Sequence, residues 1–116
     1  MRESSLLMKL AIIGSRGVNS FDLSPFIPKS TTEIVSGGAK GVDTIARRFA
    51  EERGIKLTEF LPEYSKYGKS APIIRNRMIV NNADAILAIW DGSSKGTAFT
   101  IDFAKKQRKQ VIIVNP

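Results

Sequence analysis

Short apolar segments alternate with amphipathic segments along this chain, and this alternation limits its fold more than any other feature of the sequence. The apolar segments cover residues 10–13, 33–36, 56–61, 85–90 and 110–114. The first, fourth and fifth are apolar throughout and rich in β-branched residues. This pattern is typical of strands that are buried on both faces of a parallel sheet.

The segments between these strands have helical periodicity. Residues 43–53 carry an apolar stripe and end before Gly54, a typical C-terminal stop. Residues 72–83 begin with a proline, and residues 97–109 repeat apolar side chains at helical spacing. Residues 20–30 contain two prolines, so the first crossover should hold only a short or broken helix. The alternation predicts right-handed βαβ units and an α/β layered fold.

The composition excludes several kinds of chemistry. The 116 residues include no histidine and no cysteine, which rules out Ser-His-Asp and Cys-His triads, thiolate zinc sites and CxxC redox pairs. The length fits one domain, and we expect residues 1–8 to be an N-terminal extension and residues 9–116 a single domain. We expect a cytoplasmic protein with no membrane segment, no metal and no required cofactor.

Glycine-rich turns with hydroxyl and basic side chains follow the first, second and fourth strands. They are Gly14-Ser15-Arg16-Gly17, Gly37-Gly38-Ala39-Lys40-Gly41-Val42-Asp43 and Asp91-Gly92-Ser93-Ser94-Lys95-Gly96-Thr97. The carboxyl ends of parallel strands meet at one sheet edge, where backbone N–H groups and helix N-termini favour phosphate. The sequence therefore predicts a phosphate-binding site. The alternative is that the turns use glycine for positive φ, and Ser, Thr or Asp as caps, without any ligand.

Two common nucleotide-binding motifs are absent from the sequence. Neither GxGxxG nor GxxxxGK[ST] occurs, so we do not expect a kinase or an NTPase.

The order of the turns carries a family resemblance. Gly14-Ser15-Arg16 is followed by Gly37-Gly38-Ala39-x-Gly41-Val42-Asp43, then Arg75-Asn76 on a helix, then Trp90-Asp91-Gly92-x-Ser94-x-Gly96-Thr97. From Lys9 to Val114 the chain resembles the SLOG superfamily, most of all its small YspA-type, YpsA-related branch. Other members are the DprA/Smf DNA-processing proteins and the Lonely Guy (LOG) phosphoribohydrolases. The resemblance implies a Rossmann-like three-layer sandwich with a mostly parallel, five-stranded sheet.

The resemblance also implies a nucleotide or nucleotide-derived ligand across the three turns. The first turn would line one wall, the second would approach the ligand by its backbone, and Gly96-Thr97 would hold a phosphate at a helix N-terminus. Arg75 would bind phosphate or carboxylate, and Arg77 should face elsewhere because residues two apart on a helix diverge. The candidate ligand-binding residues are Gly14, Ser15, Arg16, Gly37, Gly38, Ala39, Gly41, Asp43, Arg75, Asn76, Asp91, Gly92, Ser94, Gly96 and Thr97.

One position distinguishes this chain from the LOG enzymes that it resembles. Their PGGxGTxxE motif ends in a catalytic glutamate, and Thr100 takes that position here. The leading hypothesis is therefore a nucleotide-binding module, with sensing as its use. The alternative is a divergent hydrolase or transferase of nucleotide N-glycosidic bonds, with Asp91 or Asp43 as the catalytic carboxylate. For Asp91, we expect contact with a ribose hydroxyl rather than catalysis.

The net charge of +7 bears on the remaining partners. The cations expected around the pocket are Arg16, Lys40, Arg75 and Lys95, and they favour a small anionic ligand over DNA. Single-stranded DNA binding is the third hypothesis, although only Tyr64 and Tyr67 lie among cations, and we expect these tyrosines to pack over the pocket. A homodimer is the expected partner state if the helix with Phe99 and Phe103 exposes an apolar face.

Overall fold

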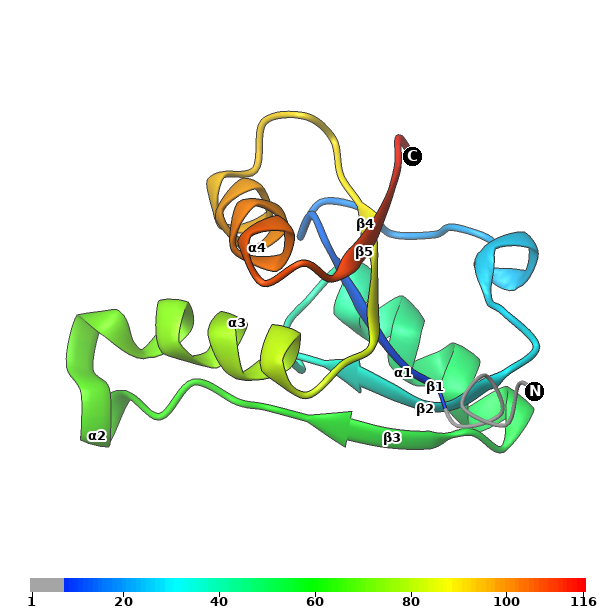
Figure 1. The fold of residues 1–116 in the computed structure, drawn as a ribbon, viewed down its shortest axis with the longest axis horizontal. Coiled ribbons are helices and arrows are strands. Elements are labelled where there is room, and N and C mark those ends of the chain that lie inside the picture. Colours follow the sequence, from blue (N-terminus) through cyan, green and yellow to red (C-terminus); the bar gives the residue numbers. More distant parts are fainter. Residues whose placement is uncertain (1–7) are drawn as a thin grey trace.

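A five-stranded sheet forms the middle layer of the computed structural model, which describes residues 8–116 (Figure 1). The strands are β1 (Met8–Gly14), β2 (Thr31–Ser36), β3 (Lys56–Glu59), β4 (Ala85–Ile89) and β5 (Gln110–Val114). All neighbours pair in parallel, in the order β3-β2-β1-β4-β5. This order is that of a Rossmann-like fold, so the predicted α/β class is confirmed.

Helices cover both faces of the sheet. Helix α1 (Val42–Arg53) lies on one face, and α3 (Ala71–Asn81) and α4 (Lys95–Lys106) lie together on the other (Figure 1). The three-layer sandwich is therefore confirmed. The β1–β2 crossover holds only a 3-10 turn (Ser24–Phe26), as its prolines predicted. Between β3 and α3 lie the short helix α2 (Tyr64–Tyr67) and a second 3-10 turn (Gly68–Ser70).

Alternating side chains of the central strands supply two cores. Leu10 and Ile12 of β1 belong to the core on the α1 side, and Ala11 and Ile13 belong to the core under α3 and α4. Leu23 of the first crossover completes the α1 side. Because each helix lies flat on the sheet and follows a parallel strand, the N-termini of α1 and α4 come to the same sheet edge as the strands' carboxyl ends.

The element boundaries differ from the predictions by a few residues. The third strand ends at Glu59 instead of continuing to residue 61, and α4 begins two residues earlier than predicted and ends at Lys106. Gly54 ends α1 with a φ of 65°, the left-handed conformation expected of a terminating glycine. Met8 already belongs to β1, and residues 1–7 of the predicted extension lie outside the described residues.

The prediction that the fifth strand is buried on both faces was wrong. β5 is the last strand of the sheet, and Ile112 and Ile113 are 38% and 44% exposed. By contrast, every residue of β4 is buried. The two strands have similar apolar sequences, so their difference in burial arises from their places in the strand order.

Among residues 8–116, no helix is long and apolar enough to cross a membrane.

Candidate functional site

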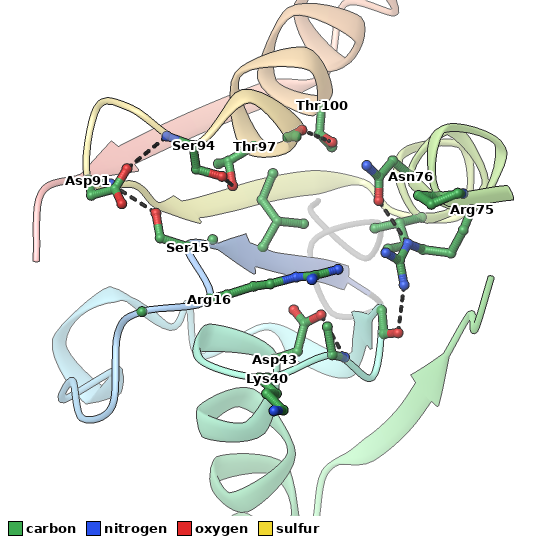
Figure 2. Close-up of a pocket in the computed structure, with 18 residues that line it drawn as sticks. Ser15, Arg16, Lys40, Asp43, Arg75, Asn76, Asp91, Ser94, Thr97 and Thr100 are labelled. Carbon is green, nitrogen blue, oxygen red and sulfur yellow. Dashed lines mark hydrogen bonds between the residues drawn. The ribbon is translucent and has the colours of Figure 1, made fainter. Parts of the chain in front are cut away.

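A cavity of about 450 Å³ opens at the carboxyl ends of β1, β2 and β4 (Figure 2). The chain leaves β1 toward β2 and leaves β4 toward β5, in opposite directions along the sheet, so a crevice forms between these two neighbouring strands. The cavity volume lies within the range of roughly 300–1,000 Å³ that is typical of small-molecule sites. Parts of all three glycine-rich turns and one side of α3 line it.

Most of the residues predicted for the site line this cavity. They are Gly14, Ser15, Arg16, Gly37, Ala39, Asp43, Arg75, Asn76, Asp91, Ser94, Gly96 and Thr97. Of the expected residues, Gly38, Gly41, Gly92 and Lys95 are not in the lining, nor are Tyr64 and Tyr67. Lys40 and Thr100 are in it, together with Ile13, Gly17, Pro72 and Ile79. Pro72 and Ile79 were missed by the sequence reasoning, although both lie at helical spacing from Arg75 and Asn76.

The first turn joins the carboxyl ends of β1 and β4. The Ser15 N–H donates to the Ile89 carbonyl at 3.1 Å, and the Ser15 hydroxyl accepts the Asp91 N–H at 3.1 Å. A Cβ on Gly14 would overlap the side chain of Val42, 2.6 Å away, and also the Ile89 carbonyl, so only glycine fits there. This packing holds the first and third turns side by side at the cavity.

Arg16 is an exposed cation whose side chain runs across the cavity toward Arg75 (Figure 2). Neither Arg16 nor Lys40 forms a salt bridge with a carboxylate of residues 8–116. Both positive charges can therefore attract an anionic ligand.

The second turn is packed tightly against the first. Gly41 has a φ of 73°, and a Cβ there would lie 2.6 Å from the Arg16 carbonyl carbon. The Val42 N–H, at the start of α1, donates to the Ser15 carbonyl at 3.3 Å. Asp43 adds a negative charge to the first turn of the same helix. The Ser15 carbonyl thus takes the first N–H group of α1. The second turn contributes Gly37, Ala39, Lys40 and Asp43 to the cavity lining, but not Gly41.

A polar cluster of Asp43, Arg75 and Gly37 lies on the side of the cavity opposite α4 (Figure 2). The Asp43 carboxylate accepts the Ala39 N–H at 3.0 Å. The Arg75 guanidinium donates to the Gly37 carbonyl at 2.8 Å and to the Asn76 side-chain oxygen at 2.8 Å. Arg75 is only 8% exposed, so its charge acts inside the protein and not in bulk solvent.

Burial shifts the ionisation of both charged groups in this cluster. It raises the pKa of the Asp43 carboxyl above its ordinary value, and the hydrogen bond from the Ala39 N–H and the charge of Arg75 only partly oppose the shift. Burial also lowers the pKa of Arg75. The negative charge of Asp43 opposes this shift, and the positive charge of Arg16 adds to it. Asp43 therefore holds its proton more strongly than an exposed aspartate does.

The third turn leaves the N-terminus of α4 open to the cavity. Ser94 is the N-cap residue, yet no side-chain hydrogen bond caps this end of the helix in the described chain. Gly96 and Thr97 line the cavity at this helix end, and the Thr97 hydroxyl lies 3.1 Å from the Ser94 hydroxyl. The first N–H groups of a helix have no partner within the helix, so they are available to an anion.

Asp91 and Thr100 flank this helix end. Asp91 Oδ1 accepts the N–H groups of Ser93 and Ser94 at 2.8 and 2.9 Å, and these bonds lower the pKa of the exposed Asp91 carboxyl. The Thr100 hydroxyl donates to the Gly96 carbonyl at 2.8 Å. Asp91 thus shapes the third turn, and Thr100 is buried beside the helix end.

Arg77 lies outside the cavity, as its spacing of two residues from Arg75 on the helix predicted. Its guanidinium is 5.8 Å from the ring centroids of both Phe99 and Phe103, between α3 and α4. No group of three or more Asp, Glu, His or Cys side chains that could hold a metal ion occurs within residues 8–116.

Comparisons with known proteins agree with this architecture. The model of the YspA, cpYpsA-related SLOG family matches residues 25–67. The chain is 36% identical over 85 residues to the Gene 61 protein of Mycobacterium phage D29, and the match spans 68% of each protein. The fold is similar to the X-ray structure of DNA processing protein A (DprA) from Streptococcus pneumoniae, with a TM-score of 0.75 and 20% identity. That match covers 97% of this chain and 52% of DprA, so the chain spans about half the length of DprA.

Proposed function

This chain belongs to the YspA, cpYpsA-related SLOG family, and we propose that it is a binding module for a phosphate-bearing nucleotide or nucleotide derivative. The observation that carries the proposal is the open N-terminus of α4 at a cavity of about 450 Å³. A helix N-terminus carries roughly half a positive charge, and its free N–H groups point at whatever lies in front of it.

The phosphate is assigned to the α4 end of the cavity. Gly96 has no Cβ, so an anion can approach the backbone closely, and the hydroxyls of Ser94 and Thr97 can donate to it. Arg16 and Lys40, which form no salt bridge within residues 8–116, supply further positive charge at the same cavity. The N-terminus of α1 is a poorer phosphate site, because its Val42 N–H already donates to the Ser15 carbonyl and Asp43 adds a negative charge to its first turn.

The nucleoside part is assigned to the opposite end of the cavity. Asn76 and Asp43 present hydrogen-bonding groups there, and Pro72 and Ile79 supply apolar surface. The ribose would reach from this end back toward the phosphate, so Asp91, beside the α4 end, would accept one of its hydroxyls through the carboxylate oxygen that does not bind Ser93 and Ser94. One polar end for phosphate and one mixed end for the nucleoside suit a ligand that carries both.

Thermal denaturation in the presence of nucleotides tests this proposal. AMP, ADP-ribose, NAD and cyclic dinucleotides would be compared with adenosine, which has no phosphate. A ligand at a hundred times its Kd stabilises the folded state by about 2.7 kcal/mol. We expect at least one phosphate-bearing compound to raise Tm and adenosine to have a much smaller effect. The absence of any nucleotide effect would overturn the proposal.

The Gly96→Ala variant locates the phosphate. A Cβ on Gly96 meets no protein atom within 4 Å, and alanine favours helix more than glycine does by about 0.5–1 kcal/mol. The variant should therefore be at least as stable as the parent without ligand but bind the nucleotide more weakly. Thr97→Val, which removes the hydroxyl, should weaken binding as well. If both variants bound the nucleotide with unchanged affinity, the phosphate could not be bound at the N-terminus of α4.

A second candidate function is cleavage of a nucleotide N-glycosidic bond. It is favoured by the Asp43 carboxyl, which lines the cavity and whose pKa is raised by burial, because a general acid must hold a proton near neutral pH. Asp91 suits this role less, since its pKa is lowered. Incubation with nucleoside monophosphates and chromatography for free base tests this candidate. Base release that Asp43→Asn abolishes and Asp91→Asn spares would support it.

A further inference from the structure

The two edges of the sheet are built differently. The β3 edge carries charged side chains held in ion pairs: Arg47 contacts Glu59 at 2.9 Å, and Lys56 lies 3.7 Å from Glu33. The β5 edge, residues 110–114, contains no charged residue. Proteins commonly place charges or prolines on an edge strand to prevent pairing with another chain. The β3 edge has this protection, and β5 does not.

The exposed side chains of β5 lie on both faces of the sheet. Ile112 is 38% exposed and Ile113 is 44% exposed, and successive residues of a strand point to opposite faces. β4 pairs with one edge of β5 over its whole length, from Gln110 to Val114. The backbone groups on the other edge face away from the sheet, and no strand of the described chain pairs with them. The strand can therefore gain both hydrogen bonds and apolar burial from one neighbour.

We propose that β5 pairs with β5 of a second copy of this chain, antiparallel, to form a symmetric dimer with one continuous sheet. Antiparallel pairing centred on Ile112 places this residue opposite the partner's Ile112. It also places Val111 opposite the partner's Ile113, on the other face. The same residues meet on both sides, as a twofold axis requires, so each exposed isoleucine gains an apolar neighbour.

The charges around β5 select this orientation. Arg108 and Lys109 directly precede the strand, and Lys105 and Lys106 end α4 just before them. Antiparallel pairing puts the basic groups of the two copies at opposite ends of the shared strands, whereas parallel pairing would superpose them. The charged β3 edge is a poor partner for β5, so the assembly closes at two copies and does not extend into a fibre.

Sedimentation equilibrium of matched lysine variants tests the dimer. Ile113 on β5 and Ile73 on α3 are both 44% exposed, so Ile73→Lys controls for the loss of an exposed isoleucine and the gain of a charge. We expect the parent and Ile73→Lys to sediment as dimers at high concentration and Ile113→Lys as a monomer. Ile112→Thr, a milder change on the other face, should weaken the dimer. Circular dichroism and Tm verify that each variant is folded.

Salt dependence supplies an independent test. Each copy carries a net charge of +7, so like charges oppose association, and added salt should tighten the dimer by screening them. A monomeric parent at all concentrations would overturn the proposal. So would a folded Ile113→Lys variant that remains dimeric. Dissociation of Ile73→Lys alone would place the interface on α3 instead.

Discussion

The Arg75 guanidinium donates a hydrogen bond to the Gly37 carbonyl at 2.8 Å, which joins α3 to the turn after β2 across 38 positions of sequence. The contact is close on every side, because a Cβ built on Gly37 would lie 2.8 Å from Arg75 Nη1 and 3.0 Å from Asp43 Oδ2. Gly37 therefore sets how near the buried guanidinium and the carboxylate come to the backbone. We therefore expect the cavity wall on this side to depend on Gly37, Arg75 and Asp43 together.

Gly37→Ala should destabilise the protein. The added methyl must displace the buried Arg75 guanidinium or the partly buried Asp43 carboxylate, and overpacking of this kind costs about 1–3 kcal/mol. Gly17→Ala is the matched control, since Gly17 also lines the cavity but a Cβ there meets nothing within 4 Å. Urea denaturation measures both. Equal free energies of unfolding for Gly37→Ala and the parent would contradict the close packing.

Arg75→Met should lower stability by about 1–3 kcal/mol, because it leaves the buried Gly37 carbonyl without its donor. Arg77→Met is the control on the outer side of the same helix, where the lost cation–π contact is worth only about 0.5–1 kcal/mol. Chemical denaturation of the two variants gives the comparison. A larger loss from Arg77→Met than from Arg75→Met would mean that the buried guanidinium is not the stabilising one.

Asp43→Asn should change how stability depends on pH. The pKa of Asp43 is raised in the folded protein, so the folded state binds its proton more tightly than the unfolded chain, and ionisation of Asp43 costs stability as pH rises through the folded pKa. The asparagine variant avoids this cost and can still accept the Ala39 N–H. The Tm of the variant minus the Tm of the parent should therefore be more positive near neutral pH than at a pH below the ordinary pKa of aspartate. A difference that is constant with pH would contradict the shifted pKa.

Arg108→Gly should stabilise the connection between α4 and β5. Arg108 has a φ of 60°, a conformation that costs non-glycine residues roughly 1–2 kcal/mol. Glycine removes this strain at an entropic cost of about 0.5–1 kcal/mol, so a gain of up to about 1.5 kcal/mol remains. Gln107→Gly, at a neighbouring position with φ of −83°, has no such strain to relieve and should destabilise. Scanning calorimetry distinguishes the two, and a lower Tm for Arg108→Gly would refute the prediction.

Local patterns in the sequence predicted most of the elements. The apolar runs located all five strands, and helical spacing located α1, α3 and α4 to within a few residues, because side-chain period and end signals are local properties of the chain. The same reasoning predicted that three glycine-rich turns meet at one sheet edge. It also predicted that Tyr64 and Tyr67 pack over the pocket, but both residues lie on α2 and do not line the cavity.

The sequence by itself determined the layered fold, the edge at which the turns meet and the supply of cations there. Only the tertiary structure decided which helix N-terminus stays open to the cavity, since the Val42 N–H at the start of α1 donates to the Ser15 carbonyl, whereas no side-chain hydrogen bond within the described residues caps α4. It also decided that β5 is an exposed edge while β4 is buried. Strand order and turn-to-turn packing depend on contacts between distant residues, and no local pattern encodes them.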